Sequence, residues 1–228
     1  MLAAAALLLG LLVPGGPAAA PAGLRGAHGP ALLLRVRPQE ALRVRTRPGG
    51  RTLGWLGTWT LYDRRSIASV TRVEGRWAQI LTDLVPNGRR AWVRLERSAA
   101  DLRWSRYEAR ADLSRRALEV LRDGRRVRAV RVAIGTAATP TPRGRFAITD
   151  KLDGRRFGAA YGCCILALSG HQPRVRVDGV EGRLAIHGTD RPRGLGRRDS
   201  LGCLHTTDRA MRWLGRTLPV GTPVTIVP

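Results

Sequence analysis

Alternating hydrophobic and polar positions along most of the chain predict short β-strands. The stretch "LRVRTRPGG" alternates leucine and valine with arginines before a Pro-Gly-Gly turn, which is the period of two typical of a half-buried strand. "SVTRVEGRWAQIL" indicates two strands around Gly75, and Asn87-Gly88 in "VPNGRRAWVRL" is a signal for a type I′ hairpin. Residues 31–97 are therefore expected to form a small module of strands.

The second half of the chain repeats this pattern and ends differently. "ALEVLRDGRRVRAVRVAIG" gives two alternating arms around Asp123-Gly124, which favours a hairpin, although "SRRALEVLRD" alone also has helical propensity. The loop "TPTPRG" precedes a strand beginning at Arg145, and "GTPVTIVP" supplies a terminal strand. Thr206 or Thr207 can cap a short helix whose apolar residues share one face. The fold class is therefore mainly β with one short helix.

The first module resembles a known small domain. Its opening "VR" strand, its Trp strand and its closing "NG...WV" hairpin are similar to a bacterial SH3-like barrel over residues 31–97. Short strands with Trp recur in many small barrels, so we expect Trp77 and Trp92 to fill the core, with ligand stacking as the alternative. The polar residues 98–106 are expected to be a linker to a second domain over residues 107–228.

The charge balance narrows the range of partners. The formal net charge is +23, and Lys151 is the only lysine among the 40 basic residues. Such a charge favours polyanionic surroundings, including anionic cell-wall polymers, although arginines along strands can equally form solvated faces. No basic tail or aromatic RNA-binding signature supports a specific nucleic-acid partner.

The N-terminal residues point to export. "MLAAAALLLGLLVPGGPAAAPAG" contains an apolar run followed by small residues, as in the core and cleavage zone of a signal peptide over residues 1–22. The run is shorter than the roughly 20 residues that a transmembrane helix needs, and it lacks a positive leading segment. We expect a secreted protein of the cell envelope, without a stable membrane span; tethering by an uncleaved segment is the alternative.

The chain gathers its scarce reactive residues near the C-terminus. His187, Ser200, Cys203 and His205 lie in "IHGTDRPRGLGRRDSLGCLH", within a chain of 3 Cys and 4 His. A thiol nucleophile needs a nearby base because little of it is thiolate at neutral pH, and histidine suits that task. A zinc site is the competing interpretation, but the stretch offers no paired Cys-x-x-Cys or His-x-x-x-His spacing.

Glycines in this stretch have their own predicted roles. Gly188 allows a tight turn after His187, and its carbonyl can fix the imidazole tautomer by accepting a hydrogen bond. Gly202 removes a side chain beside the thiol, so that the backbone N–H groups of Gly202 and Cys203 can point at a developing oxyanion.

The combined motifs resemble a known catalytic domain. "AIHGT...DSLGCLH" is similar to the signature of the L,D-transpeptidase family, in which a His-Gly pair precedes a Ser/Thr-x-Gly-Cys block. "IGTAATPTPRG" and the closing "GTPVTIV" agree with the same domain over residues 107–228. The resemblance places the nucleophile at Cys203, the general base at His187, and the motif serine and glycine at Ser200 and Gly202.

The resemblance also implies a reaction. The cysteine attacks the L-centre carbonyl of the third residue of a peptidoglycan tetrapeptide stem and expels D-alanine, and an amine of an acceptor stem resolves the thioester into a 3→3 cross-link. No metal or cofactor is implied. Water as acceptor would give an L,D-carboxypeptidase, and another amine would attach a protein to the wall. A non-catalytic wall-binding protein is the alternative from a different class.

The chain departs from the family pattern at two positions. His205 stands where family members commonly carry Arg or Asn, so its supporting role is open, and Leu201 stands where histidine is frequent. Tyr161 and His171 are further candidates for substrate binding, with a surface or core position as the alternative for each.

Cys163 and Cys164 have no assigned role. Three alternatives are open for this adjacent pair: both side chains are buried as small hydrophobes, the two form a vicinal disulfide, or one of them pairs with a cysteine elsewhere. A secreted thiol-disulfide protein would need the three cysteines to exchange.

Overall fold

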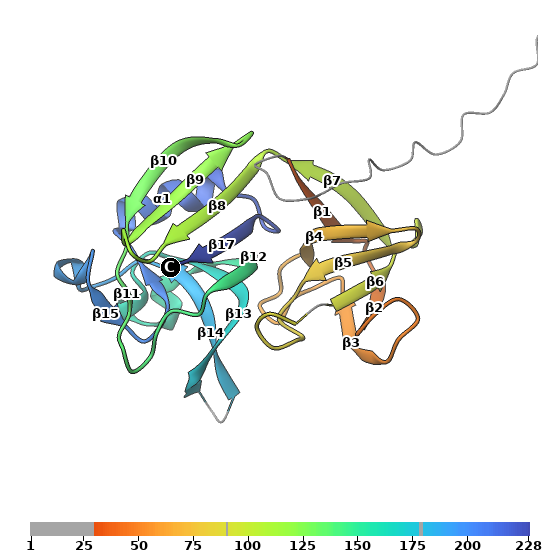
Figure 1. Cartoon of the computed structure of the whole chain (residues 1–228), viewed down its shortest axis with the longest axis horizontal. Coiled ribbons are helices and arrows are strands. Elements are labelled where there is room, and N and C mark those ends of the chain that lie inside the picture. Colours follow the sequence, from red (N-terminus) through yellow and green to blue (C-terminus); the bar gives the residue numbers. More distant parts are fainter. Residues whose placement is uncertain (1–29, 90, 178–179) are drawn as a thin grey trace, which may run out of the picture.

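Two β-rich modules make up the described part of the protein. The computed structural model describes residues 30–89, 91–177 and 180–228, and the two modules lie side by side (Figure 1). The signal peptide predicted over residues 1–22 lies outside the described residues. Within them, no helix combines the length and the apolar character needed to cross a membrane.

The N-terminal module is a seven-stranded sheet in the order β3-β2-β6-β5-β4-β1-β7. Its core consists of the inward side chains of alternating strand positions, among them Leu34, Val44 and Ile80, all at most 2% exposed. Trp92 is buried as expected for core filling, whereas Trp77 is only partly buried. The strands are β1 (Ala31–Val36), β2 (Ala41–Arg45), β3 (Thr52–Gly57), β4 (Ile67–Glu74), β5 (Trp77–Leu81), β6 (Ala91–Arg94) and β7 (Ala100–Ser105). The SH3-like resemblance stays a prediction.

Two local expectations for this module are wrong. The residues 98–106 are not a linker, because they contain β7, which pairs antiparallel with β1 as the edge strand of the sheet. Asn87-Gly88 is not a type I′ turn: only Gly88 has a positive φ, and the turn sits inside a longer loop between β5 and β6. The side chain of Asn87 is used elsewhere, at the contact between the modules.

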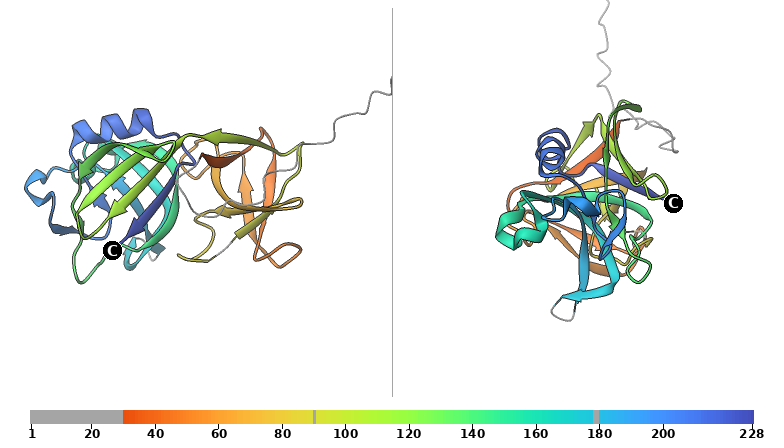
Figure 2. Two further views of the ribbon diagram at one scale, coloured as in Figure 1. Left: turned by 45° about the horizontal axis from the view of Figure 1, so that its top comes forward. Right: turned by 90° about the vertical axis from the view of Figure 1, so that its left-hand side faces the viewer.

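The C-terminal module is built on an eight-stranded sheet in the order β10-β9-β8-β17-β12-β13-β14-β16, which curls around its core (Figure 2). Its strands are β8 (Tyr107–Asp112), β9 (Ala117–Arg122), β10 (Arg125–Arg131), β12 (Gly144–Asp153), β13 (Cys164–Val177), β14 (Val180–His187), β16 (Leu204–His205) and β17 (Pro223–Val227). The short strands β11 (Ile134–Gly135) and β15 (Arg198–Ser200) pair in parallel beside it. The 3₁₀ turns are η1 (Gly154–Phe157), η2 (Ala159–Tyr161) and η3 (Pro192–Gly194).

Several predictions for this module are confirmed. β9 and β10 form a hairpin about Asp123 and Gly124, both with positive φ as a type I′ turn requires. The helix α1 (Asp208–Thr217) begins after Thr207, whose hydroxyl accepts from the Ala210 N–H at 3.2 Å. Its buried face of Ala210, Met211 and Leu214 joins the core of the sheet. The protein is therefore mainly β with one α-helix in the described residues.

The sheet order brings the reactive stretch together. β14 ends at His187, and β16 runs parallel to it with His187 opposite His205. Cys203 immediately precedes β16, so the loop that carries the thiol is anchored directly beside the strand that carries the histidine. On β14, Leu184 and Ile186 point into the core, and the alternation of a strand therefore places Arg183, Ala185 and His187 on the other face.

Candidate active site

His187 is held in one orientation at the end of β14. The side chain is 4% exposed, and its Nδ1 lies 2.6 Å from the carbonyl oxygen of Gly188. A carbonyl can only accept, so Nδ1 carries the proton and Nε2 is left as the basic nitrogen. This confirms the tautomer-fixing contact predicted for Gly188.

Gly188 has no room for a side chain. A Cβ there would overlap the carboxylate of Asp208 and approach the backbone of Gly162. Its N–H donates to the carbonyl of Cys164 at 3.1 Å, and Asp208 accepts from the N–H of Cys163 at 2.9 Å. The corner after His187 is therefore fixed from two sides.

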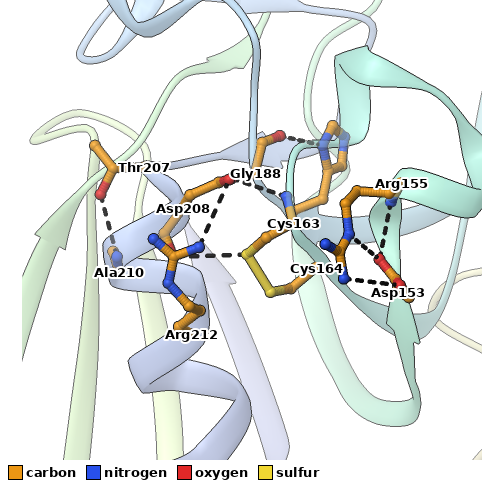
Figure 3. Close-up of a disulfide and its surroundings, with 10 residues drawn as sticks. Asp153, Arg155, Cys163, Cys164, Gly188, Thr207, Asp208, Ala210 and Arg212 are labelled. Carbon is orange, nitrogen blue, oxygen red and sulfur yellow. Dashed lines mark hydrogen bonds and ion pairs between the residues drawn. A yellow bond between two sulfur atoms is a disulfide. The ribbon is translucent and has the colours of Figure 1, made fainter.

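A vicinal disulfide forms part of this corner. Cys163 and Cys164 form a disulfide bond with each other. The structure therefore selects the vicinal disulfide among the alternatives that the sequence leaves open. Figure 3 shows the disulfide between the start of α1 and the segment of Asp153 and Arg155, close to Gly188. Cys203 is the free cysteine.

Cys203 lies against the backbone of β14. Its Sγ is 3.8 Å from the carbonyl oxygen of Arg183, and the residue is partly exposed. No hydrogen bond joins its thiol to His187 in the described part of the chain. The thiol thus lies against the backbone of the strand that ends at His187, and at rest it points to that backbone.

The turn that carries the thiol is shaped by Ser200. Its hydroxyl donates to the carbonyl of Cys203 at 2.6 Å and accepts from the N–H of Gly202 at 3.0 Å. The N–H of Gly202 is therefore engaged, which differs from its predicted role as an oxyanion donor. Within the described residues the N–H of Cys203 has no acceptor. Of the two predicted oxyanion donors, the N–H of Cys203 is therefore the one that is available to a ligand.

Gly202 is required for two physical reasons. Its φ of +121° lies in a region that side chains avoid, and an added Cβ would overlap the amide of Gln172. Gln172 is itself buried on β13 and donates from Nε2 to the carbonyl of Pro140 at 2.9 Å. No local pattern predicts this role for Gln172, because it lies 30 residues before Gly202 in the chain.

Burial keeps the reacting groups uncharged. Burial raises the pKa of the Cys203 thiol to about 11, and a hydrogen bond from the backbone of Ala185 opposes this only in part. Burial lowers the pKa of His187 to about 4; the neighbouring His205 adds to the decrease, and the bond to Gly188 opposes it. At neutral pH the resting site therefore holds a thiol and a neutral imidazole.

Two further rings flank His187. The ring centre of His205 lies 4.2 Å from that of His187. The ring centre of Tyr161, a residue of η2, lies 4.8 Å from that of His187. Burial, together with the charge of Arg191, lowers the pKa of His205 to about 4. Tyr161 is therefore placed at the site as predicted, and His205 contributes a second neutral imidazole there.

His171 lies at the contact between the modules instead. Its ring Nε2 is 2.9 Å from the carbonyl oxygen of Asp83, and its backbone makes two hydrogen bonds with the side chain of Asn87. The expectation that His171 lines the substrate cleft is therefore wrong. Arg183, beside it in register, forms an ion pair with Asp83 at 2.5 Å. No local sequence pattern predicts this contact, because it joins residues 100 positions apart.

The zinc alternative can be judged from the same geometry. The described residues contain no group of three or more His, Cys, Asp or Glu side chains placed to hold a metal ion. The arrangement can instead transfer a proton from a thiol to a fixed imidazole beside a free backbone N–H donor.

Comparisons with known proteins found relatives for about half of the chain. Two proteins described as putative L,D-transpeptidase YkuD match: that of Bacillus licheniformis is 30% identical over 54% of this chain and 66% of its own length, and that of Bacillus subtilis is 28% identical over 53% and 65%. The matches thus span about two thirds of the length of these curated relatives.

Solved structures with some similarity to this chain are also found. An L,D-transpeptidase from Mycobacterium smegmatis is 16% identical, with 88% of this chain and 100% of that chain covered and a TM-score of 0.44. L,D-transpeptidase 3 from Mycobacterium tuberculosis, in complex with a faropenem-derived adduct, is 15% identical, with 61% and 73% covered and a TM-score of 0.43.

The family follows from the sequence match. The model of the L,D-transpeptidase catalytic domain matches residues 106–226, which is more than half of the chain and includes Cys203, His187 and Ser200. The chain therefore belongs to the L,D-transpeptidase catalytic domain family.

Proposed function

We propose that this protein is a peptidoglycan L,D-transpeptidase of the cell envelope that forms 3→3 cross-links through a thioester on Cys203. The observation that carries the proposal is the fixed tautomer of His187, whose Nε2 is left basic at the end of the strand against whose backbone the thiol lies. That arrangement suits proton transfer from a thiol that attacks a carbonyl.

The first half-reaction transfers the acyl group to the enzyme. Cys203 Sγ attacks the carbonyl carbon of the third stem residue while His187 Nε2 takes the thiol proton. The bond from that carbon to the nitrogen of D-alanine then breaks, and the imidazolium returns the proton to the departing amine. Because thiol and imidazole are both neutral at rest, proton transfer accompanies attack rather than preceding it.

The developing oxyanion needs a donor. The N–H of Cys203 lies in the nucleophile's own turn, where Ser200 fixes the backbone by bonding the carbonyl of Cys203 and the N–H of Gly202. A pre-oriented donor of this kind lowers the barrier because it costs no reorganisation during the reaction.

The second half-reaction depends on the acceptor. A side-chain amine of a second stem gives the cross-link, water gives an L,D-carboxypeptidase product, and an amine of a protein gives attachment to the wall. All three pass through one acyl-enzyme, so product analysis with a defined acceptor stem separates them.

The test of the proposal is capture of the acyl-enzyme. Incubation with a disaccharide tetrapeptide is expected to release D-alanine and to add a thioester-linked mass to Cys203. Cys203→Ala abolishes both, and His187→Asn lowers the acylation rate by about a hundredfold or more, since a positioned base is worth that much. Absence of both signals with the parent protein rejects the enzymatic function and leaves wall binding as the alternative, which salt would weaken and Cys203→Ala would not.

A further inference from the structure

A hollow of about 210 Å³ lies where the N-terminal module meets the catalytic sheet. One wall comes from β3, the segment between β3 and β4, and the loop after β5. The other wall comes from β12 and β14, through Thr149, Asp150 and Arg183. Both modules are therefore needed to form it, and neither Cys203 nor His187 lines it.

The hollow is connected to the thiol by strand β14. Arg183 and His187 point to the same face of that strand, four residues apart, which corresponds to about 13 Å at roughly 3.3 Å per residue. The carbonyl of Arg183 is also the group that the Cys203 thiol contacts. A ligand that reaches from the thiol along β14 therefore arrives at the hollow.

An unbroken series of ring contacts follows the same path. Tyr62 lies in the wall of the hollow, and its ring centre is 6.0 Å from that of Phe157. The ring centres of Phe157 and Tyr161 are 6.2 Å apart, and those of Tyr161 and His187 are 4.8 Å apart. Phe157 and Tyr161 are both exposed. The surface between the hollow and the site thus carries a series of aromatic rings.

Two tryptophans in the hollow each have one face covered and much of the ring open. The guanidinium of Arg43 lies 4.8 Å from the ring centre of Trp55, and that of Arg65 lies 5.2 Å from the ring centre of Trp59. Trp55 is nevertheless 55% exposed and Trp59 57%. The covered faces hold the rings in place, and the remaining surface suits stacking against a flat apolar ligand face.

A buried carboxylate gives the hollow its polar character. Asp150 is 1% exposed and lines the hollow, and in the described structure its carboxylate is bonded by the hydroxyl of Thr60 alone. A carboxylate has about four lone-pair sites, so it retains capacity for hydroxyl or amide donors of a ligand. Such a buried acceptor with one protein donor is costly unless a ligand or solvent completes its bonding.

The residues that line the hollow carry no excess of positive charge for an anionic ligand. Its lining contains two carboxylates, Asp83 and Asp150, and one cation, Arg183, which is already paired with Asp83. This balance is unusual in a chain of net charge +23. The ligand that fits is therefore neutral, rich in hydrogen-bond donors, and apolar on one face.

We propose that the hollow binds a pyranose ring of the glycan strand that carries the donor stem. A sugar ring offers an apolar C–H face to tryptophan and hydroxyl donors to Asp150, and a volume below the usual range of roughly 300–1,000 Å³ suits a single ring. The inference rests on the proposed function: three extended stem residues span roughly 10 Å, which can join a sugar in the hollow to a third carbonyl at the thiol, because the thiol contacts the backbone of Arg183 and the side chain of Arg183 lines the hollow. The third carbonyl then reaches the thiol while the sugar occupies the hollow.

The test compares two substrates and two tryptophan variants. The parent is expected to acylate from a disaccharide tetrapeptide with a kcat/KM about tenfold above that for the free tetrapeptide, the gain typical of one stacked ring. Trp59→Ala lowers this ratio to near one. Trp104→Ala is the matched control, since Trp104 is 56% exposed on β7 and does not line the hollow, and it keeps the ratio of the parent.

Binding of the sugar alone separates this inference from the proposed function. Saturation-transfer NMR with the free disaccharide and the Cys203→Ala protein is expected to show contact at the protons of the sugar ring. Adding Trp59→Ala to this protein is expected to abolish the contact, whereas adding Trp104→Ala leaves it unchanged. Binding without acylation of either substrate would reject the transpeptidase and keep the sugar site. Acylation with equal kcat/KM for both substrates, or no disaccharide contact, overturns the sugar site.

Discussion

The nucleophile of this site is a protonated thiol at rest. Burial raises the pKa of Cys203 to about 11 and lowers that of His187 to about 4, so no thiolate–imidazolium pair forms at neutral pH. The neutral pair costs less to bury than an ion pair would. It also leaves Cys203 poorly reactive toward anything that the site does not bind and orient.

Alkylation of Cys203 as a function of pH tests this protonation state. Iodoacetamide reacts with the thiolate, so the rate is expected to be low at pH 7, to rise about tenfold per pH unit, and to level off only near pH 11. Mass spectrometry of the intact protein measures it, and Cys203→Ala is the blank because the other two cysteines are bonded to each other. A rate that is flat from pH 5 to pH 9 would instead reveal an ion pair.

Gly202 offers a second test at the same scale. Gly202→Ala is expected to lower the free energy of unfolding by about 1–3 kcal/mol and to abolish acylation, because the backbone sits at φ +121° and the new Cβ overlaps Gln172. Gly215→Ala on α1 is the control, since a Cβ there meets nothing within 4 Å and the helix gains stability. Urea unfolding and thioester formation measure both effects. Equal behaviour of the two variants contradicts the packing argument.

Which site residues the sequence predicts depends on how far apart they are along the chain. The roles of His187, Gly188 and Cys203 rest on groups within one motif, so local chemistry and resemblance suffice to name them. Gln172 and Arg183 act through contacts made only once β13 and β14 are paired, and no periodicity encodes such contacts. The position of His171 at the contact between the modules likewise depends on a residue distant in the chain, Asp83.

At the scale of elements, the start of β13 connects the disulfide to the catalytic corner. The carbonyl of Cys164 accepts from the N–H of Gly188, whose own carbonyl orients His187. Local pattern predicts the hairpin at Asp123-Gly124 correctly, whereas the same kind of signal at Asn87-Gly88 does not give a type I′ turn. β7 alternates apolar and polar residues, but its apolar Leu102 and Trp104 are exposed, and only pairing with β1 makes the segment part of the sheet rather than a linker.

Reduction of the disulfide is expected to impair catalysis. Opening the bond between Cys163 and Cys164 frees the backbone that fixes Gly188, and a misplaced base costs about tenfold or more in rate. The measurement is D-alanine release before and after treatment with a phosphine reductant, which does not intercept the thioester as a thiol would. The Cys163→Ser, Cys164→Ser double variant is the control: its rate is low and indifferent to the reductant. A parent rate that does not change on reduction would show that the corner is rigid without the bond.

At the scale of the whole molecule, the two modules share a polar interface. Asp83 binds Arg183, Asn87 binds the backbone of His171, and Thr60 bonds to Asp150. Each contact reaches β12, β13 or β14, the strands that lead to the site. The N-terminal module is therefore in contact with the catalytic strands themselves, and its loss would leave these polar groups without partners.

The buried histidines make global stability depend on pH. The pKa of His187 is about 4 in the folded protein and about 6.5 when unfolded, so the unfolded state takes up the proton first as pH falls. The stability associated with the neutral imidazole is fully present above pH 6.5 and is lost between pH 6.5 and pH 4, on the order of 3 kcal/mol for His187. Urea unfolding at pH 7, 6, 5 and 4 in 0.5 M salt measures this loss while screening repulsion among the arginines. In His187→Asn the decrease from pH 7 to pH 4 is expected to be smaller by about that amount, whatever the stability of the variant at pH 7. A decrease of the same size in parent and variant would mean that His187 titrates normally, and the neutral resting site would have to be abandoned.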